Sequence, residues 1–96
     1  MKLISIKKDK DGKHKFVAVF LLDNNRHKTT HFGAHGYEDF TTHHDKVRKA
    51  LYLKRHEKNE DWNDPTSAGS LSRHILWHHE DLDTAIKDFV KKFNLI

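Results

Sequence analysis

The stretch His14–Leu22, HKFVAVFLL, is the most apolar run of the 96-residue chain and decides its fold class. Alternate side chains of a β-strand point to opposite faces of a sheet. Here one face holds Phe16, Ala18, Phe20 and Leu22, and the other holds Val17, Val19 and Leu21. Because both faces are apolar, the run predicts the central strand of a sheet, with a neighbouring strand on each side.

Turn signals separate this run from a shorter strand candidate before it and a more polar one after it. The Asp-Gly pair at 11–12 is a strong hairpin signal, and it follows LISIKK at Leu3–Lys8. Asp23–Asn25 forms a second turn signal, because Asn and Asp tolerate left-handed backbone angles. The alternating stretch Arg26–Phe32 then completes a three-stranded antiparallel meander.

Helical spacing begins in the middle of the chain. A first helix is predicted from about Asp45 to Lys58, with Thr42 as its cap. Its apolar stripe, expected to face the core, consists of Val47, Ala50, Leu51 and, less regularly, Leu53. The first part of the chain therefore leads into a helix whose remaining surface is largely basic.

Two further helices are predicted after this one. Asp64-Pro65 fits the start of a second helix, which should end near Trp77 or His79. The third helix should begin near Asp81, and its pattern is the most regular in the chain. Its apolar stripe is formed by Leu82, Ala85, Ile86, Phe89, Val90 and Phe93.

These patterns predict one α+β domain over residues 1–96. The domain should consist of a β-meander (1–33), an ordered loop (34–44) and a helical part (45–96). The fold class expected is a three-stranded antiparallel β-meander followed by three α-helices packed on the sheet. A chain of this size is long enough to bury one hydrophobic core.

The composition favours an anionic partner and excludes thiol chemistry. The chain has 18 Lys and Arg against 14 Asp and Glu, which gives a formal net charge of +4. Basic domains attract phosphate-bearing molecules, although such a charge also simply keeps a protein soluble. There is no cysteine, so disulfides, thiolate zinc sites and cysteine nucleophiles are excluded. No apolar run approaches a membrane span or a signal peptide, so we expect a soluble, intracellular or particle-packed protein.

The stretch Lys28–Asp45, KTTHFGAHGYEDFTTHHD, is the most distinctive part of the chain. It is too polar for an ordinary core segment and too rich in rings for an ordinary linker. Together with the basic helix that follows, it suits phosphate contacts and base stacking. The residues predicted to bind nucleic acid are Arg26, Lys28, Thr29, His31, Tyr37, His43, Arg48, Lys49 and Arg55. The competing interpretation is a solvated basic face.

Metal binding and catalysis find weaker support. His74 and His78 have the i, i+4 spacing of two ligands on one helix, but a zinc site needs three or four converging ligands. We therefore expect no metal and no cofactor. A nuclease-like acid–base site has suitable side-chain types in His31, Asp39, His43, Asp45 and Arg48, yet their spacing is not diagnostic. The sequence favours a protein without catalytic residues and leaves a metal-dependent nuclease-like enzyme as an alternative.

A set of motif residues between 28 and 77 carries a family resemblance. These residues are Lys28, Thr29, His31, Phe32, Gly33, Gly36, Tyr37, Asp39, Thr41, His43, Arg55, His56, Trp62, Ala68, Gly69 and Trp77. This pattern resembles a family of small uncharacterised proteins of nucleocytoplasmic large DNA viruses. The chain departs from the family pattern at Phe40, where tyrosine is common, and at His74, where tryptophan is.

This resemblance implies a viral origin, and a location in the virion or in the host cell interior, whether cytoplasm, nucleus or viral factory. The function expected is a small basic protein that binds nucleic acid, with DNA favoured, in DNA condensation, packaging or another virion-associated role. An alternative is a minor capsid component or protein-interaction module that contacts other virion proteins. Trp62 and Trp77 would suit such an interface, because tryptophan is a common anchor there.

Overall fold

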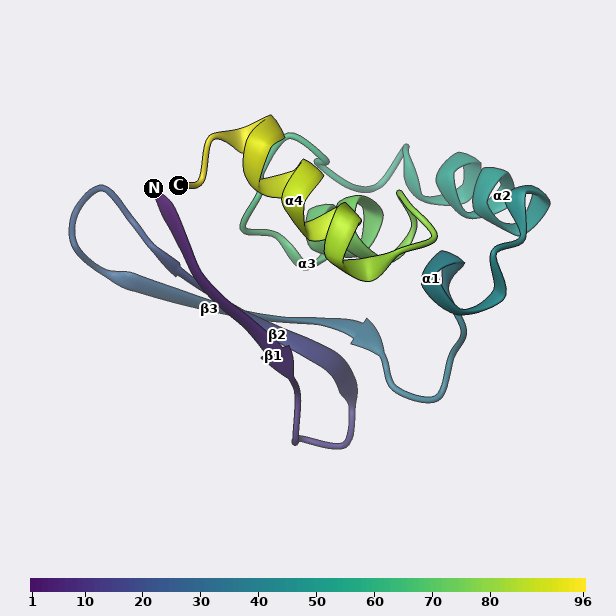
Figure 1. Ribbon diagram of the computed structural model, residues 1–96, viewed down its shortest axis with the longest axis horizontal. Helices are drawn as coiled ribbons and strands as arrows, with labels where there is room; N and C mark the ends of the chain where they lie inside the picture. Colours follow the sequence, from purple (N-terminus) through teal and green to yellow (C-terminus); the bar gives the residue numbers. More distant parts are fainter.

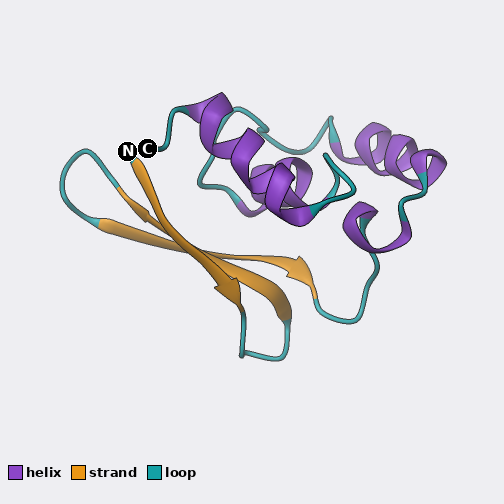
Figure 2. Ribbon diagram, viewed as in Figure 1, coloured by secondary structure: helices purple, strands orange, loops and turns teal.

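The computed structural model describes all 96 residues and confirms the α+β class. Figure 1 shows a twisted sheet with helices along one of its faces, and Figure 2 separates the strands from the helices by colour. The strands are β1 (Lys2–Lys8), β2 (His14–Leu21) and β3 (His27–Ala34). The helical elements are α1 (Phe40–His43), α2 (Lys46–His56), α3 (Ala68–Leu71), the π-helix η1 (Ser72–Leu76) and α4 (Leu82–Phe93). None of the helices combines the length and the apolar character that crossing a bilayer requires.

The sheet is the predicted antiparallel meander, in the order β1-β2-β3, with β2 in the centre. Leu3 of β1 lies opposite Phe20 of β2. Phe16 of β2 lies opposite Phe32 of β3, and their rings stack 5.8 Å apart. The register between β1 and β2 shifts between Leu3 and Ser5, as in a β-bulge, and Ile4 there is 49% exposed.

The hydrophobic core lies between one face of the sheet and the helices α3, η1 and α4. Ala18, Phe20 and Phe32 from the strands are at most 1% exposed. The helical side contributes Leu71, Ile75, Leu76 and Phe89, and Leu95 closes the end of the core. The Leu3 N–H donates to the carbonyl of Leu95, which brings the two chain ends together, as Figure 1 shows.

α4 confirms the prediction of the third helix. Asp81 is its N-cap and accepts a hydrogen bond from the Thr84 N–H. The helix ends at Asn94, which has the left-handed conformation of a typical C-cap. Ala85 and Phe89 are buried, and Leu82, Ile86, Val90 and Phe93 are partly buried against the core. This amphipathic pattern was strong enough to locate the helix from sequence.

The expectations of an ordered loop from 34 to 44, and of Thr42 as the cap of the helix after it, were wrong in part. The segment contains the four-residue helix α1, and its N-cap is Asp39. The Thr42 hydroxyl bonds back to the backbone of Asp39, so it completes the capping of α1 instead. The N-cap of α2 is Asp45, which accepts from the N–H groups of Val47 and Arg48.

The predicted apolar stripe of α2 was also wrong. Val47 and Leu51 are 69% and 57% exposed, and the residue that α2 buries is Tyr52. The ring of Tyr52 stacks on Trp77 with a centroid distance of 4.2 Å and an interplanar angle of 3°. Figure 1 places α2 beyond the end of the sheet rather than on its face. The helix therefore packs through Tyr52 on a ring that is distant in sequence, and it leaves Val47 and Leu51 in solvent.

The second predicted helix begins later than expected. Asp64 does not cap a helix, because its carboxylate accepts from the N–H and hydroxyl of Thr66 within a turn. The N-cap is Ser67, which accepts from the Ser70 N–H. α3 then passes directly into the π-helix η1, which ends before Trp77, where the helix was expected to end.

Candidate nucleic-acid interface

A cleft of about 620 Å³ lies where the end of β3, the loop after it, α2 and the α3–η1 segment meet. Its volume is in the range of small-molecule and cofactor sites. Four segments that are far apart in sequence build it. The residues that define it are Gly33, Tyr37, Arg48, Tyr52, Arg55 and Trp77.

Gly33 sets how closely β3 passes the π-helix at one side of the cleft. Its φ is +77°, a conformation that side chains rarely adopt. A Cβ at this position would lie 2.8 Å from Leu76 Cδ1 and 3.1 Å from Lys15 Cβ. A glycine is therefore required both for the backbone angle and for the close packing of β3 against η1.

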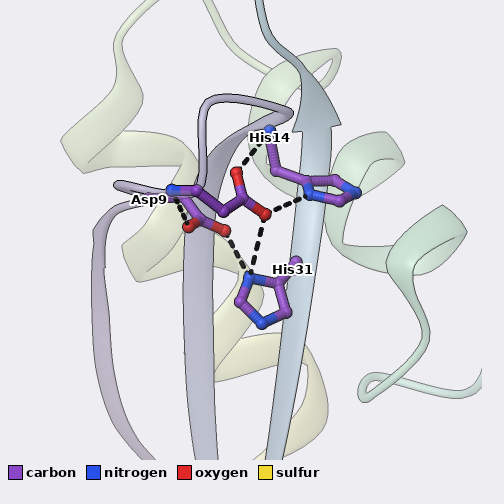
Figure 3. A group of neighbouring side chains, drawn as sticks. Asp9, His14 and His31 are labelled. Atoms are coloured by element: carbon purple, nitrogen blue, oxygen red, sulfur yellow. Dashed lines mark hydrogen bonds and ion pairs between the residues drawn. The ribbon is translucent and has the colours of Figure 1, made fainter.

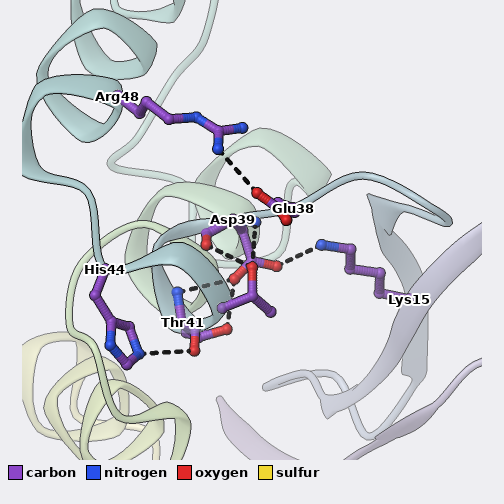
Figure 4. Close-up of polar contacts among 7 residues, drawn as sticks. Lys15, Glu38, Asp39, Thr41, His44 and Arg48 are labelled. Carbon is purple, nitrogen blue, oxygen red and sulfur yellow. Dashed lines mark hydrogen bonds and ion pairs between the residues drawn. The ribbon is translucent and has the colours of Figure 1, made fainter.

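A buried carboxylate fixes the loop between β3 and α1. Asp39 is 3% exposed, and it accepts hydrogen bonds from the backbone N–H and the hydroxyl of Thr41. Lys15 of β2 reaches its second oxygen with an Nζ–Oδ2 distance of 2.5 Å (Figure 4). The contact ties α1 to the central strand. A buried carboxylate with these partners holds the loop and the start of α1 in place.

A ladder of stacked rings forms the back of the cleft. Tyr52 lies between Trp77 and His56, with its ring 4.3 Å from that of His56. His43 packs against the other end of the ladder, 5.3 Å from Trp77. Burial, followed by the charge of Glu60, raises the pKa of Tyr52 to about 12. Tyr52 is therefore neutral at physiological pH and serves as a wall.

Glu60 joins the ladder to the loop before α3. Its carboxylate accepts from His56 Nδ1 at 2.9 Å and from Trp62 Nε1 at 3.0 Å. A Cβ on Gly69 would lie 2.8 Å from the Glu60 carboxyl carbon, so glycine allows the approach. Two acidic residues of the cleft, Asp39 and Glu60, are thus engaged within the protein.

The rim of the cleft is the part that remains open to a ligand. Tyr37 is 74% exposed, so its ring is accessible from solvent. Arg48 pairs with Glu38 at 2.8 Å, and both side chains are about half exposed or more. Arg55 lies further along α2. Its side chain is exposed and makes no hydrogen bond or ion pair within the protein. A surface ion pair contributes little, so Arg48 can exchange partners readily.

The structure brings together three of the nine residues predicted to bind nucleic acid, namely Tyr37, Arg48 and Arg55. Arg26 precedes β3 at the β2–β3 turn, which Figure 1 shows at the end of the molecule opposite α2. Lys28 lies on the helical side of the sheet, where its Nζ donates to the Thr66 hydroxyl.

Other predicted residues lie elsewhere or are held by intramolecular contacts. Thr29 and His31 lie on the sheet face that the helices leave uncovered, opposite Val19 and Val17. The His43 ring packs between Phe40 and Trp77, and its Nδ1 accepts from the Asp45 N–H.

Lys49 donates to the carbonyl of His78 and lies 4.8 Å from the centre of the Phe40 ring. Burial, together with nearby Arg73, lowers the pKa of Lys49. The histidine pair considered for a metal has separate partners. His74 Nε2 lies 3.0 Å from the Trp62 carbonyl, and His78 lies 3.1 Å from Asp88.

Sequence reasoning missed Lys15, Glu60 and Gly69 as parts of this region. Each makes a contact with a residue distant in sequence. Lys15 pairs with Asp39, and Glu60 packs closely against Gly69. No local pattern marks such contacts. The glycine at 69, placed within a helix, is the one sequence signal, because glycine in a helix often marks a close approach.

Comparison with known proteins assigns the chain to a family but not to an activity. The model of one protein family, described as a family of unknown function (DUF5754), matches residues 4–56. The match covers more than half of the 96 residues and includes the sheet, the Asp39 loop and α2. No curated protein and no solved structure matches the chain significantly. The chain belongs to this family of unknown function.

Proposed function

We propose that this family member binds nucleic acid without catalysing a reaction, with DNA as the favoured ligand. The observation that carries the proposal is the open rim of the cleft, to which exposed Tyr37 and the unpartnered Arg55 both contribute. The formal net charge of +4 supports it, since a cationic surface attracts polyanions. In this proposal the cleft holds one nucleotide of a strand that continues along α2.

The arginines of α2 supply the phosphate contacts. Arg48 and Arg55 are seven residues apart on one helix and both line the cleft. Arginine binds phosphate oxygens through paired N–H donors. Arg55 is available at once, whereas Arg48 exchanges Glu38 for a phosphate group. Because Glu38 is exposed, its displacement leaves no buried charge without a partner.

Tyr37 supplies the contact to a base. An exposed tyrosine beside arginine side chains suits single-stranded nucleic acid, since every base has a flat face for stacking. The cleft of about 620 Å³ is wide enough to admit a nucleotide beside this ring. Stacking on one ring carries little sequence preference, so we expect binding that tolerates many sequences.

The test is a titration of untagged protein against fluorescent single-stranded DNA, double-stranded DNA and RNA of equal length. We expect affinity for all three to weaken as salt rises from about 50 to 300 mM, because binding releases counterions from the phosphates. Single-stranded DNA should bind most tightly of the three. Affinity that is absent, or that persists unchanged across the salt range, would contradict the proposal.

A matched pair of variants separates the cleft from charge in general. Arg55→Ala and Lys54→Ala each remove one positive charge from neighbouring exposed positions of α2. Arg55 lines the cleft and Lys54 does not. We expect Arg55→Ala to weaken binding at least about fivefold and Lys54→Ala less than about twofold. Equal losses would mean that the chain binds by overall charge alone.

The setting of this activity is part of the proposal. The resemblance to proteins of large DNA viruses supports a role in the virion or the viral factory, in condensing or packaging DNA. Mass spectrometry of purified virions and of isolated viral factories would test it. We expect the chain in one of these fractions, and its absence from both would contradict this location.

A protein-interaction module is the second candidate, because α2 exposes aliphatic side chains. Val47 and Leu51 are four residues apart on one face of the helix and are more than half exposed. Such a pair suits a contact with another virion protein. Cross-linking through residue 47 should then capture one specific partner, and loss of that partner in Leu51→Ser would support this candidate over DNA binding.

A further inference from the structure

Four side chains that bind metals in other proteins meet at the opposite end of the sheet from Arg26, outside the cleft. Asp9 and Asp11 belong to the turn between β1 and β2, His14 begins β2, and His31 lies on β3. Figure 3 shows the Asp9 carboxylate directed toward the His31 ring, with the His14 ring nearby. Each residue offers one ligand atom, and these atoms all lie within 4.8 Å of one another.

The contacts within the group pair each carboxylate with a ring nitrogen. His14 Nδ1 lies 2.8 Å from Asp11 Oδ2, and His31 Nδ1 bonds to Asp9 Oδ2. His31 Nδ1 is also 3.7 Å from Asp11 Oδ2, so the two pairs are themselves adjacent. The donor set is therefore two imidazole nitrogens and two carboxylate oxygens.

The backbone of the turn orients both carboxylates. Asp9 Oδ1 accepts from the Asp11 N–H at 3.0 Å. Asp11 Oδ1 accepts from the N–H groups of Lys13 and His14 at 2.8 and 2.9 Å. In each carboxylate one oxygen is thus held by the chain, while the other is left to face the imidazoles. The ligand atoms are positioned by local structure before any ion arrives.

Burial separates this group from an ordinary set of surface charges. The Asp9 side chain is 5% exposed, and the backbone N–H of Asp9 donates to Lys15 O of the adjoining strand. His14 and His31 remain 40% and 46% exposed, so solvent and ions reach the rings. A carboxylate that is nearly buried at the base, with accessible imidazoles above, forms a site open on one side.

The contacts of the group place hydrogen-bonded protons where a cation would be bound. The His14 and His31 rings each face a carboxylate oxygen, that of Asp11 and that of Asp9. A metal ion replaces these protons and bonds to the same nitrogen and oxygen atoms.

We propose that Asp9, Asp11, His14 and His31 bind one zinc ion and so join the β1–β2 turn to β3. Zinc takes four ligands in a tetrahedron and accepts both imidazole nitrogen and carboxylate oxygen. With bonds of about 2.0–2.2 Å, the ligand atoms lie roughly 3.3 Å apart. The distances from Asp11 Oδ2 to His14 Nδ1, 2.8 Å, and to His31 Nδ1, 3.7 Å, lie on either side of this spacing. Small side-chain rotations therefore complete the tetrahedron. Mg²⁺ and Ca²⁺ prefer all-oxygen sites and should bind far more weakly.

The site depends on strand register, which the sequence analysis did not predict. His31 lies opposite Val17 in the β2–β3 pair, and this alignment brings its ring to the turn before β2. The local signal is the spacing of Asp9, Asp11 and His14 within six residues. The fourth ligand is 17 residues further along the chain, and no spacing rule connects it to the turn.

Isothermal titration of untagged, chelator-treated protein with Zn²⁺, Mg²⁺ and Ca²⁺ tests the proposal. We expect one Zn²⁺ per chain, no detectable Mg²⁺ or Ca²⁺ binding, and a rise in the thermal unfolding midpoint with Zn²⁺, because the ion binds the folded form. Failure of the wild-type chain to bind Zn²⁺ would overturn the proposal.

Variants locate the site. His31→Ala and Asp9→Asn should each weaken Zn²⁺ binding at least about tenfold. His27→Ala is the matched control, since His27 is an exposed histidine on the same strand and face but outside the group. Circular dichroism in the presence of chelator confirms that each variant is folded. Zn²⁺ binding that survives His31→Ala, or that is lost equally in His27→Ala, would overturn the assignment.

Discussion

The sheet with α4 and the region of α1 and α2 are held together by different kinds of contact. Around the sheet, large apolar side chains such as Phe20 and Phe89 are buried almost completely. Around α1 and α2, the contacts are a buried Asp39–Lys15 pair, helix caps and a ladder of stacked rings. That second region also exposes Tyr37.

The difference separates stability from binding. Apolar burial is not directional and supplies most of the free energy of folding. Hydrogen bonds and ring stacks contribute less, but they fix orientation. A small chain that builds its core on one side can leave rings and arginines exposed on the other. The α1–α2 region is therefore where we place ligand binding, and three perturbations test the contrast.

The largest effect should come from the core of the sheet region. Phe89→Ala removes a ring that is 1% exposed and leaves a cavity, which should cost about 3–5 kcal/mol of unfolding free energy. The matched change in the other region is Leu51→Ala, on exposed α2, with an expected cost below about 0.5 kcal/mol. Denaturant unfolding measures both. Similar losses of unfolding free energy in Phe89→Ala and Leu51→Ala would contradict the difference between the two regions.

A smaller effect is expected at the buried Asp39–Lys15 pair of the α1–α2 region. Asp39→Ala removes the cap of α1 and leaves the Lys15 ammonium without its partner, at a cost of about 2 kcal/mol. Asp39→Asn keeps a capping oxygen and should cost less. If both changes cost nothing in denaturant unfolding, the Asp39 network does not hold the loop.

The smallest effect concerns His74, which joins the core to the segment between α2 and α3. Its ring packs on Phe93 beside the core, and its Nε2 contacts the Trp62 carbonyl of that segment. Burial lowers the pKa of His74, and the positive charges of Arg73 and Lys92 act in the same direction.

Between the lowered folded value and the unfolded value near 6.5, the unfolded chain binds more protons. The contribution of His74 to stability is therefore present above pH 6.5 and is lost as pH falls toward the folded value. Unfolding free energies should be measured at about pH 8 and about pH 5.5 for wild type and His74→Gln. On going to the lower pH, wild type should lose more stability than the variant. A difference between the two proteins that does not change with pH would contradict this account.

Periodicity predicted the sheet region because its elements obey local rules. The alternation in His14–Leu22 and the regular stripe of α4 each show the buried face directly. The turn signals at 11–12 and Asp23–Asn25 then fixed the order of the strands. These features need no information from elsewhere in the chain, so sequence reasoning located them.

The α1–α2 region was predicted less well because its contacts are distant. Tyr52 is buried because Trp77, 25 residues later, stacks on it, and that contact outweighs the aliphatic stripe of α2. Of the predicted binding residues, the cleft brings together Tyr37, Arg48 and Arg55, and their role in binding stays a prediction. The proposed zinc-binding group was not predicted for the same reason, because the β2–β3 register brings His31 to Asp9, Asp11 and His14.

The most direct test of the central claim is Tyr37→Ala measured for both affinity and stability. The ring is 74% exposed, so unfolding free energy should change by less than about 0.5 kcal/mol. Affinity for single-stranded DNA, measured by fluorescence anisotropy, should fall at least about fivefold, because one stacking contact is lost. Loss of affinity at unchanged stability is the result that the account predicts. Unchanged affinity for DNA in a folded Tyr37→Ala variant would contradict it.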